Sequence, residues 1–262
     1  MAQRLVRAKR KIRDAGIPYA VPETKDIAER LGAVLTVIYL IFNEGYAATR
    51  GGLLIRGDLC TEAIRLGRLV RTLMAPQPPP EATALLALML LHDARRDARL
   101  DAAGDLVILE NQDRTRWHQP QIAEALPLVT EALRGRPGPF ALQAAIAAVH
   151  CRATRAEDAD WPQIVWLYDL LEQVHPSPIV SLNRAVAVAM AHGPEAGLIL
   201  IEKIAPRVIS TAICCGVWDP PRKQLGPMNK RCPWQPMTAS VAISSGGCEK
   251  FDRQKPSEEL DF

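Results

Sequence analysis

The residues most able to do chemistry lie at the start of the chain, where basic side chains occur without acidic ones. The first 13 residues contain six Arg or Lys residues and no Asp or Glu. Cations along a short segment bind phosphate groups, and Gln3 and Arg4 can also bind base edges in a major groove. The residues predicted to contact nucleic acid are Gln3, Arg4, Arg7, Lys9, Arg10, Lys11 and Arg13. A solvated helix or a weak membrane-surface segment is the alternative.

Residues 1–16, here called the basic arm, hold all the excess positive charge of the chain. The formal net charge is +3, but the residues after position 13 carry 26 basic and 29 acidic side chains. The arm has high helix propensity, and Gly16 and Pro18 are typical of a helix end. Leu5, Ala8 and Ile12 give it one narrow apolar edge. Such a helix can pack its edge on a neighbouring helix and present its cations to a duplex.

Two other groups of polar residues could be interpreted as acid and base sites. They are His92-Asp93 with Arg95 and Arg96, and Asn43-Glu44. Polar residues near helix ends usually cap the helix or pair charges, and this is the interpretation we favour. The sequence also lacks a Gly-rich phosphate loop, a nucleophile elbow and a metal-binding His pair, so an enzyme is the weakest functional class.

The cysteines do not indicate a metal site. Four of the six lie late in the chain, at Cys214, Cys215, Cys232 and Cys248. They lack the paired Cys-x-x-Cys spacing of structural zinc, and their number and spacing do not form a secreted disulfide framework. We expect reduced thiols, no metal and no cofactor. With no signal peptide or long uncharged apolar stretch in the sequence, we also expect a cytoplasmic protein without membrane contact.

The elements that would position these groups are helices. Hydrophobic residues make up 48% of the chain and aromatic residues only 5%, which is typical of packed helices rather than sheets. A turn and a short extended segment are expected at 101–109, without a sheet. Apolar residues spaced by three and four predict helices over 24–43, 56–73, 81–96, 119–133, 139–154, 161–174, 179–192 and 194–204. The expected fold is all-α, with stacked antiparallel helical hairpins preceded by a basic helix.

Two of these helical regions carry further expectations. The pattern over 24–43 predicts a mostly buried helix that ends at Asn43-Glu44-Gly45. Later, Asn183, Ala187, Gly193, Ala196 and Leu200 resemble a tetratricopeptide unit, in which small residues let two antiparallel helices approach closely. An ordinary helical bundle is the alternative.

Several longer motifs together resemble a known family. These are Tyr39-Leu-Ile-Phe-Asn-Glu-Gly-Tyr46, Arg56-Gly-Asp-Leu-Cys-Thr-Glu-Ala-Ile-Arg-Leu66, Leu88-Met-Leu-Leu-His-Asp-Ala-Arg-Arg96, Gln112-Asp-Arg-Thr-Arg-Trp117, Arg134-Gly-Arg-Pro-Gly-Pro-Phe140 and Leu182-Asn-Arg-Ala-Val-Ala-Val-Ala189. They are similar to motifs of extracytoplasmic-function RNA polymerase sigma factors that carry a C-terminal helical extension with tetratricopeptide-like repeats. The resemblance covers residues 1 to about 206.

The resemblance implies a role for each part of the chain. Residues 1–16 correspond to the end of sigma region four, whose last helix enters the major groove at the −35 element. Residues 17–23 are then a linker, and 24–206 are the helical extension. The implied partners are promoter DNA and RNA polymerase core in the intact protein, with a possible protein partner on the extension. Complete members begin with region two and the rest of region four, so the resemblance predicts an N-terminally truncated sigma factor.

The last part of the chain departs from this pattern. Residues 1–206 contain 28 leucines, whereas the 56 residues of 207–262 contain two. We expect 207–262 to be an irregular tail that is out of frame, with a frameshift between about residues 201 and 208. The alternative function is a protein-binding or regulatory module without its own DNA-binding activity.

Overall fold

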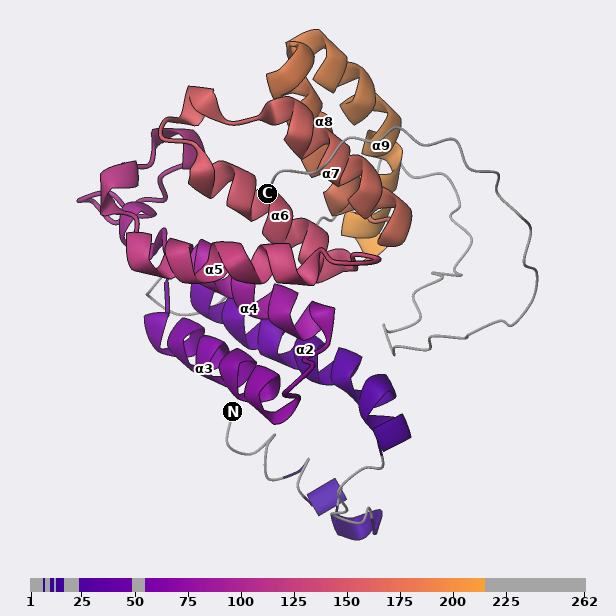
Figure 1. The fold of residues 1–262 in the computed structure, drawn as a ribbon. Helices are drawn as coiled ribbons and strands as arrows, with labels where there is room; N and C mark the ends of the chain where they lie inside the picture. The colour runs from indigo at the N-terminus through magenta and orange to yellow at the C-terminus, as the bar shows by residue number, and fades with distance from the viewer. Residues whose placement is uncertain (1–6, 8–9, 12, 17–23, 49–54, 215–262) are drawn as a thin grey trace, which may run out of the picture.

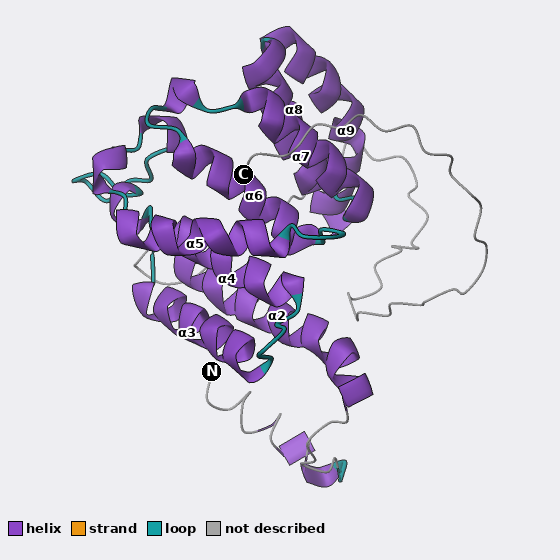
Figure 2. Ribbon diagram, in the orientation of Figure 1, coloured by secondary structure: helices purple, strands orange, loops and turns teal. Residues whose placement is uncertain are grey.

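The computed structural model describes residues 7, 10–11, 13–16, 24–48 and 55–214. Within these ranges the protein is all-helical (Figure 2). The only extended pairing in these ranges is an isolated antiparallel bridge between Leu100 and Leu106. The helices are α2 (Thr24–Tyr46), α3 (Gly57–Leu73), α4 (Pro80–Asp93), α5 (Gln119–Ala132), α6 (Pro139–Arg152), α7 (Trp161–Val174), α8 (Pro178–His192) and α9 (Pro194–Cys214). Short 3-10 turns lie at Arg96–Ala98, Leu109–Asn111, Arg114–Arg116 and Ala156–Asp158.

The helices form a stack of sequential pairs, which confirms the predicted fold. Each helix from α2 to α9 packs on the next, and α4 also contacts α2 and α6 (Figure 1). The stack progresses from α2 and α3 at one end to α8 and α9 at the other. The 25 residues between α4 and α5 hold three of the 3-10 turns and pack against the ends of α4 and α6.

Helix α4 lies at the centre of the stack because it is apolar on all sides. All ten residues from Ala82 to Leu91 are buried. A helix without a polar face can bury its side chains only when other helices surround it. Pro80 begins α4, where the missing N–H costs no hydrogen bond.

The close contact between α8 and α9 depends on small residues, as the sequence indicates. A Cβ atom placed on Gly197 would lie 2.5 Å from the Cβ of Ala189 and 2.8 Å from the carbonyl oxygen of Ala185. Gly193 ends α8 with φ of 102°, and its N–H donates to the carbonyl of Ala189. Gly197, which is not part of the tetratricopeptide-like pattern, therefore lies where the two helices approach too closely for a larger side chain.

Helix α2 differs from its prediction in two ways. It continues through Gly45 to Tyr46 instead of ending at Asn43. Gly45 is needed for close packing, since a Cβ there would lie 2.7 Å from the backbone nitrogen of Cys60. The helix is also buried on one side only. Leu35, Ile38 and Phe42 are buried, whereas Val37 on the opposite side is 56% exposed.

The predicted ends of two other helices also differ from the structure. Helix α4 ends at Asp93, because Arg96–Ala98 tightens into a 3-10 turn. The backbone helix of α9 continues to Cys214, beyond the predicted end at residue 204. Of the predicted irregular tail, residues 215–262 lie outside the described residues, as does the linker 17–23.

Candidate functional site

The predicted DNA-binding residues are only partly described by the structure. Arg7, Arg10, Lys11 and Arg13 are helical and exposed. The helix ends as predicted at Gly16, which has φ of 60° and donates its N–H to the carbonyl of Arg13. The remaining predicted contacts, Gln3, Arg4 and Lys9, lie outside the described residues. The DNA contact itself stays a prediction.

A second group of cations lies inside the stack, near the ends of α4 and α6. Arg95 is only 7% exposed. Its Nη2 donates to the hydroxyl of Tyr46 at 3.2 Å and lies 2.7 Å from Nδ1 of His92. Its guanidinium also lies over the ring of Trp117, with its central carbon 5.9 Å from the ring centroid. Since an arginine can only donate, Nδ1 of His92 accepts and the neutral imidazole carries its proton on Nε2.

Two further arginines surround Arg95 and have different partners. Arg99 donates to the carbonyl oxygen of Tyr46, and its guanidinium carbon lies 3.4 Å from the centroid of that ring. Arg114 donates to the carbonyl oxygens of His150 and Ala153 at 2.6 and 2.8 Å. Arg114 thereby caps the C-terminal end of α6, where free carbonyls and the helix dipole favour a cation.

This inner group, here called the arginine cluster (Arg95, Arg99 and Arg114), is not paired with acids. Within the described ranges, no carboxylate forms an ion pair with any of the three. Guanidinium groups are instead placed against aromatic faces and carbonyl oxygens, which suit their flat, weakly hydrated charge. A positive potential is therefore left inside the stack.

The nearby histidines respond to this environment. Burial is the largest cause that lowers the pKa of His150, and together with the charges of Arg95 and Arg114 it brings this pKa to about 4. The pKa of His92 lies well below its usual range, first because of burial and then because of Arg95 and Arg99. Both imidazoles are therefore neutral near pH 7.

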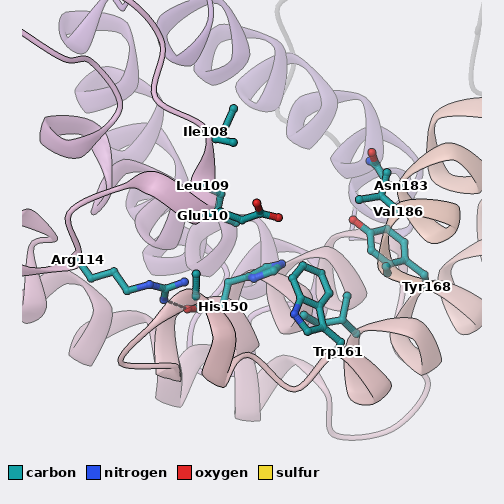
Figure 3. A pocket seen from close by; sticks show the side chains of 12 residues that line it. Ile108, Leu109, Glu110, Arg114, His150, Trp161, Tyr168, Asn183 and Val186 are labelled. Carbon is teal, nitrogen blue, oxygen red and sulfur yellow. Dashed lines mark hydrogen bonds between the residues drawn. The ribbon is translucent and has the colours of Figure 1, made fainter. Parts of the chain in front are cut away.

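Two adjacent pockets open beside the arginine cluster. The first, here called the Trp161 pocket, has a volume of about 220 Å³ and contains Glu110, Arg114, His150 and Trp161 in its wall. Figure 3 shows His150 beside Trp161, with Tyr168 and Asn183 on the neighbouring helices. The second, here called the Arg95 pocket, has a volume of about 490 Å³. The two share His150, Tyr168, Asn183 and Leu109, so they form neighbouring parts of one hollow between α6, α7 and α8.

The group His92-Asp93-Arg95-Arg96 thus divides between two roles. Asp93 and Arg96 form the expected ion pair, and Asp93 also accepts from Gln121 at 3.0 Å. His92 and Arg95 do not cap a helix or pair with an acid, and both lie in the wall of the Arg95 pocket. These residues are adjacent in the sequence, but the sequence does not indicate that Asp93 and Arg96 form an ion pair while His92 and Arg95 line a pocket.

An apolar surface lies at the other end of the stack, between α2 and α3. This α2–α3 groove has a volume of about 410 Å³. The described side chains of its wall are all apolar and include Val37, Leu69 and Leu73. Leu73 is 72% exposed, and together with its apolar neighbours it forms a contiguous exposed patch, the kind of surface that marks an interaction site.

Known proteins that are similar to this chain have no stated activity. Residues 30–133 match a family of unknown function (DUF6596). An uncharacterized protein of Rhizobium meliloti (strain 1021) is 49% identical over 227 residues, which is 86% of this chain and 53% of the relative. The chain therefore spans about half the length of the curated relative it matches. No solved structure matches the chain.

The extent of that similarity bears on the end of the chain. A match of 227 residues is longer than residues 1–206, so it reaches into 207–262. The frameshift stays a prediction that the coding DNA tests. None of the helices in the described ranges is both long and apolar enough to cross a membrane.

Proposed function

We propose that the chain is part of an extracytoplasmic-function RNA polymerase sigma factor, with the basic arm as the end of its DNA-binding region and α2–α9 as its helical extension. The observation that carries the proposal is the exposure of Arg7, Arg10, Lys11 and Arg13 on a short helix that precedes a stack of helical pairs. The motif resemblance over residues 1 to about 206 supports the same assignment. In the intact protein the partners are promoter DNA and RNA polymerase core.

The arm alone supplies positive charge rather than a complete promoter-reading domain. Short isolated helices are marginal in water, and a recognition helix needs a scaffold helix beneath it. The chain by itself is therefore expected to bind duplex DNA through phosphates, with affinity that falls as salt rises. Promoter selection requires region two and the rest of region four in the same polypeptide.

The DNA contact is tested by fluorescence anisotropy with a labelled duplex over a range of salt concentrations. Arg10→Ala with Lys11→Ala should weaken binding and reduce the slope of log affinity against log salt by about 2, because each phosphate contact contributes about 0.9. Arg134→Ala with Arg136→Ala removes the same charge from an exposed loop and is the matched control. Equal losses in the two pairs would count against a DNA-binding arm.

The second candidate function, a protein-binding module, is favoured by the α2–α3 groove. An exposed groove with a wholly apolar wall is the kind of surface on which an amphipathic helix docks. The partner tested is RNA polymerase core, which the sigma assignment requires in any case. A helix of the polymerase seated in this groove would cover Val37 and Leu73.

Binding of the chain to purified polymerase core tests this second function. Val37→Glu with Leu73→Glu should weaken binding by about tenfold or more, because two charges would have to be buried in an apolar contact. Leu198→Glu, at an exposed apolar position on α9, is the control. The docking proposal fails if the groove pair and the α9 control bind polymerase equally well.

A further inference from the structure

Arg95 has a buried charge that its structural partners satisfy only in part. Its Nη2 is used by Tyr46 and His92, but its Nε is buried and has no hydrogen-bond partner. Arg71 on α3 also has a buried Nε without a partner, yet its charge is paired with Glu131 at 2.8 Å. Arg95 therefore differs in lacking a carboxylate among the described residues.

Such a charge is costly unless something compensates it. A buried unpaired ion loses its hydration without gaining an equivalent interaction. Arg99 and Arg114 recover part of that loss from backbone carbonyls, whereas Arg95 has a phenol and an imidazole as hydrogen-bond partners and the more distant ring of Trp117. An anion against Arg95 would supply the missing interaction.

The pocket beside Arg95 has room for more than a bare ion. Its volume of about 490 Å³ lies within the usual range for small-molecule sites, roughly 300 to 1,000 Å³. Tyr39, Ile146, Tyr168 and Leu171 form an apolar and aromatic part of its wall. Gln143 and Asn183 add polar groups on the same wall, which could fix the orientation of a ligand.

We propose that the Arg95 pocket binds a small organic carboxylate, with its carboxylate on Arg95 and its apolar body against Tyr39 and Tyr168. Among the described residues of the pocket wall, arginine is the only cationic type apart from histidine and none is acidic, which suits a single negative charge. A nucleic-acid backbone or an acidic peptide would need several cations in a row. The Nε2–H of His92, which also lines the pocket, is a second donor for the carboxylate.

The neighbouring Trp161 pocket is less suited to the charged end of the ligand. Glu110 lies in its wall, and Arg114 there already donates to two carbonyl oxygens. The charged group therefore belongs in the Arg95 pocket. This ligand site does not rest on the sigma-factor proposal, since binding can be measured on the chain without DNA or polymerase.

Isothermal titration calorimetry of the full chain tests the proposal. The probes are benzoate, phenylacetate and indole-3-acetate, each compared with its neutral amide, together with inorganic phosphate. At least one carboxylate should bind about tenfold more tightly than its amide, since the amide lacks the charge that pairs with Arg95. Arg95→Met should abolish the preference of the pocket for the carboxylate over the amide. Arg65→Met, at an exposed position on α3, should leave it unchanged.

A second variant keeps the test informative if Arg95→Met does not fold. Asn183 is exposed at the edge of the pocket, so Asn183→Asp should fold and add a repelling charge without changing the shape of the side chain. This variant should weaken binding of the carboxylate by about fivefold or more. The proposal is overturned if no carboxylate binds, if each amide binds equally well, or if Asn183→Asp has no effect. Tighter binding of phosphate than of every carboxylate would also overturn it.

Discussion

Arginines on the outside of the stack and arginines inside it are held in opposite ways. On the outer surface, Arg68 pairs with Glu124 at 2.8 Å, and the partly buried Arg71 beside it pairs with Glu131 at 2.8 Å; both pairs join α3 to α5. Inside, the arginine cluster packs on Tyr46 and Trp117 and donates to backbone carbonyls. The same residue type thus has a carboxylate partner in one place and none in the other.

The difference teaches where charge remains available. An exposed ion pair gains little, because water competes for both partners and salt screens them. A guanidinium bonded to carbonyls keeps its full positive charge, since a carbonyl has no charge to cancel it. The outer pairs therefore cancel their own charges, whereas the charges of the cluster add to burial, the larger cause, in lowering the pKa of His150 and His92.

The largest effect is expected from Arg114→Ala. This change removes two hydrogen bonds to the end of α6 and the packing of the guanidinium over Trp117, 4.4 Å from the ring centroid. The free energy of unfolding should fall by about 3 kcal/mol, because bonds from a charged donor to a partly buried acceptor are among the stronger ones. Chemical denaturation measures it, with Arg116→Ala, exposed in the same turn, as the control. Similar losses in both variants would mean that the cap contributes little.

An intermediate effect is expected from pH. The unfolded chain protonates His150 near pH 6.5, whereas the folded protein protonates it near pH 4, so the unfolded state holds more protons between these values. The free energy of unfolding should therefore decrease as pH falls from about 6.5 to about 4, by roughly 2 to 3 kcal/mol from this residue.

The variant His150→Asn isolates that contribution, because its side chain does not titrate. Denaturation curves between pH 4 and 7 should show a smaller slope for this variant than for the unmodified protein. Part of the slope should remain, since the pKa of His92 is lowered in the same direction. His192→Asn, exposed at the end of α8, is the control. An unchanged slope in His150→Asn would show that the folded protein does not lower the pKa of this imidazole.

The smallest effect is expected from the outer pair of Arg68 and Glu124. Both side chains are about half exposed, so their coupling in a double-mutant cycle should be about 0.5 kcal/mol. It should decrease further in 1 M salt, which screens exposed charges. If this coupling free energy were as large as the loss of stability in Arg114→Ala, exposed and inner arginines would contribute equally to stability, and the comparison would fail.

The spacing of apolar residues predicted the helices well because it indicates which side chains have to be buried. The run from Ala82 to Leu91 has no polar face, and it is buried on all sides as such a run must be. The spacing does not indicate how much of a helix surface the neighbouring helices bury. Val37 and Leu40 lie within 24–43, which the pattern predicts to be mostly buried, but α3 and α4 pack against one side of α2 and leave both side chains exposed.

The arginine cluster could not be predicted in the same way. Its members come from the turn after α4 and from the separate turn around Arg114, and only the packing of α6 and α4 brings them together. Arginine near a helix end usually remains in solvent, so Arg95 gave no signal of burial. Leu109 and Trp117 lie among polar residues in the same connection and pack against the core, so they were the available hint that this segment packs inward.

Both ends of α6 are stabilised by residues from other parts of the chain. Glu81 of α4 accepts from the backbone nitrogens of Phe140 and Ala141 at its beginning, and Arg114 caps its end. In a simple repeat array each unit would supply its own termini and could fold beside any neighbour. Here a polypeptide beginning at Gln119 would retain all of α6 and lose both caps. The middle of the stack should consequently gain and lose its structure as one cooperative unit instead of pair by pair.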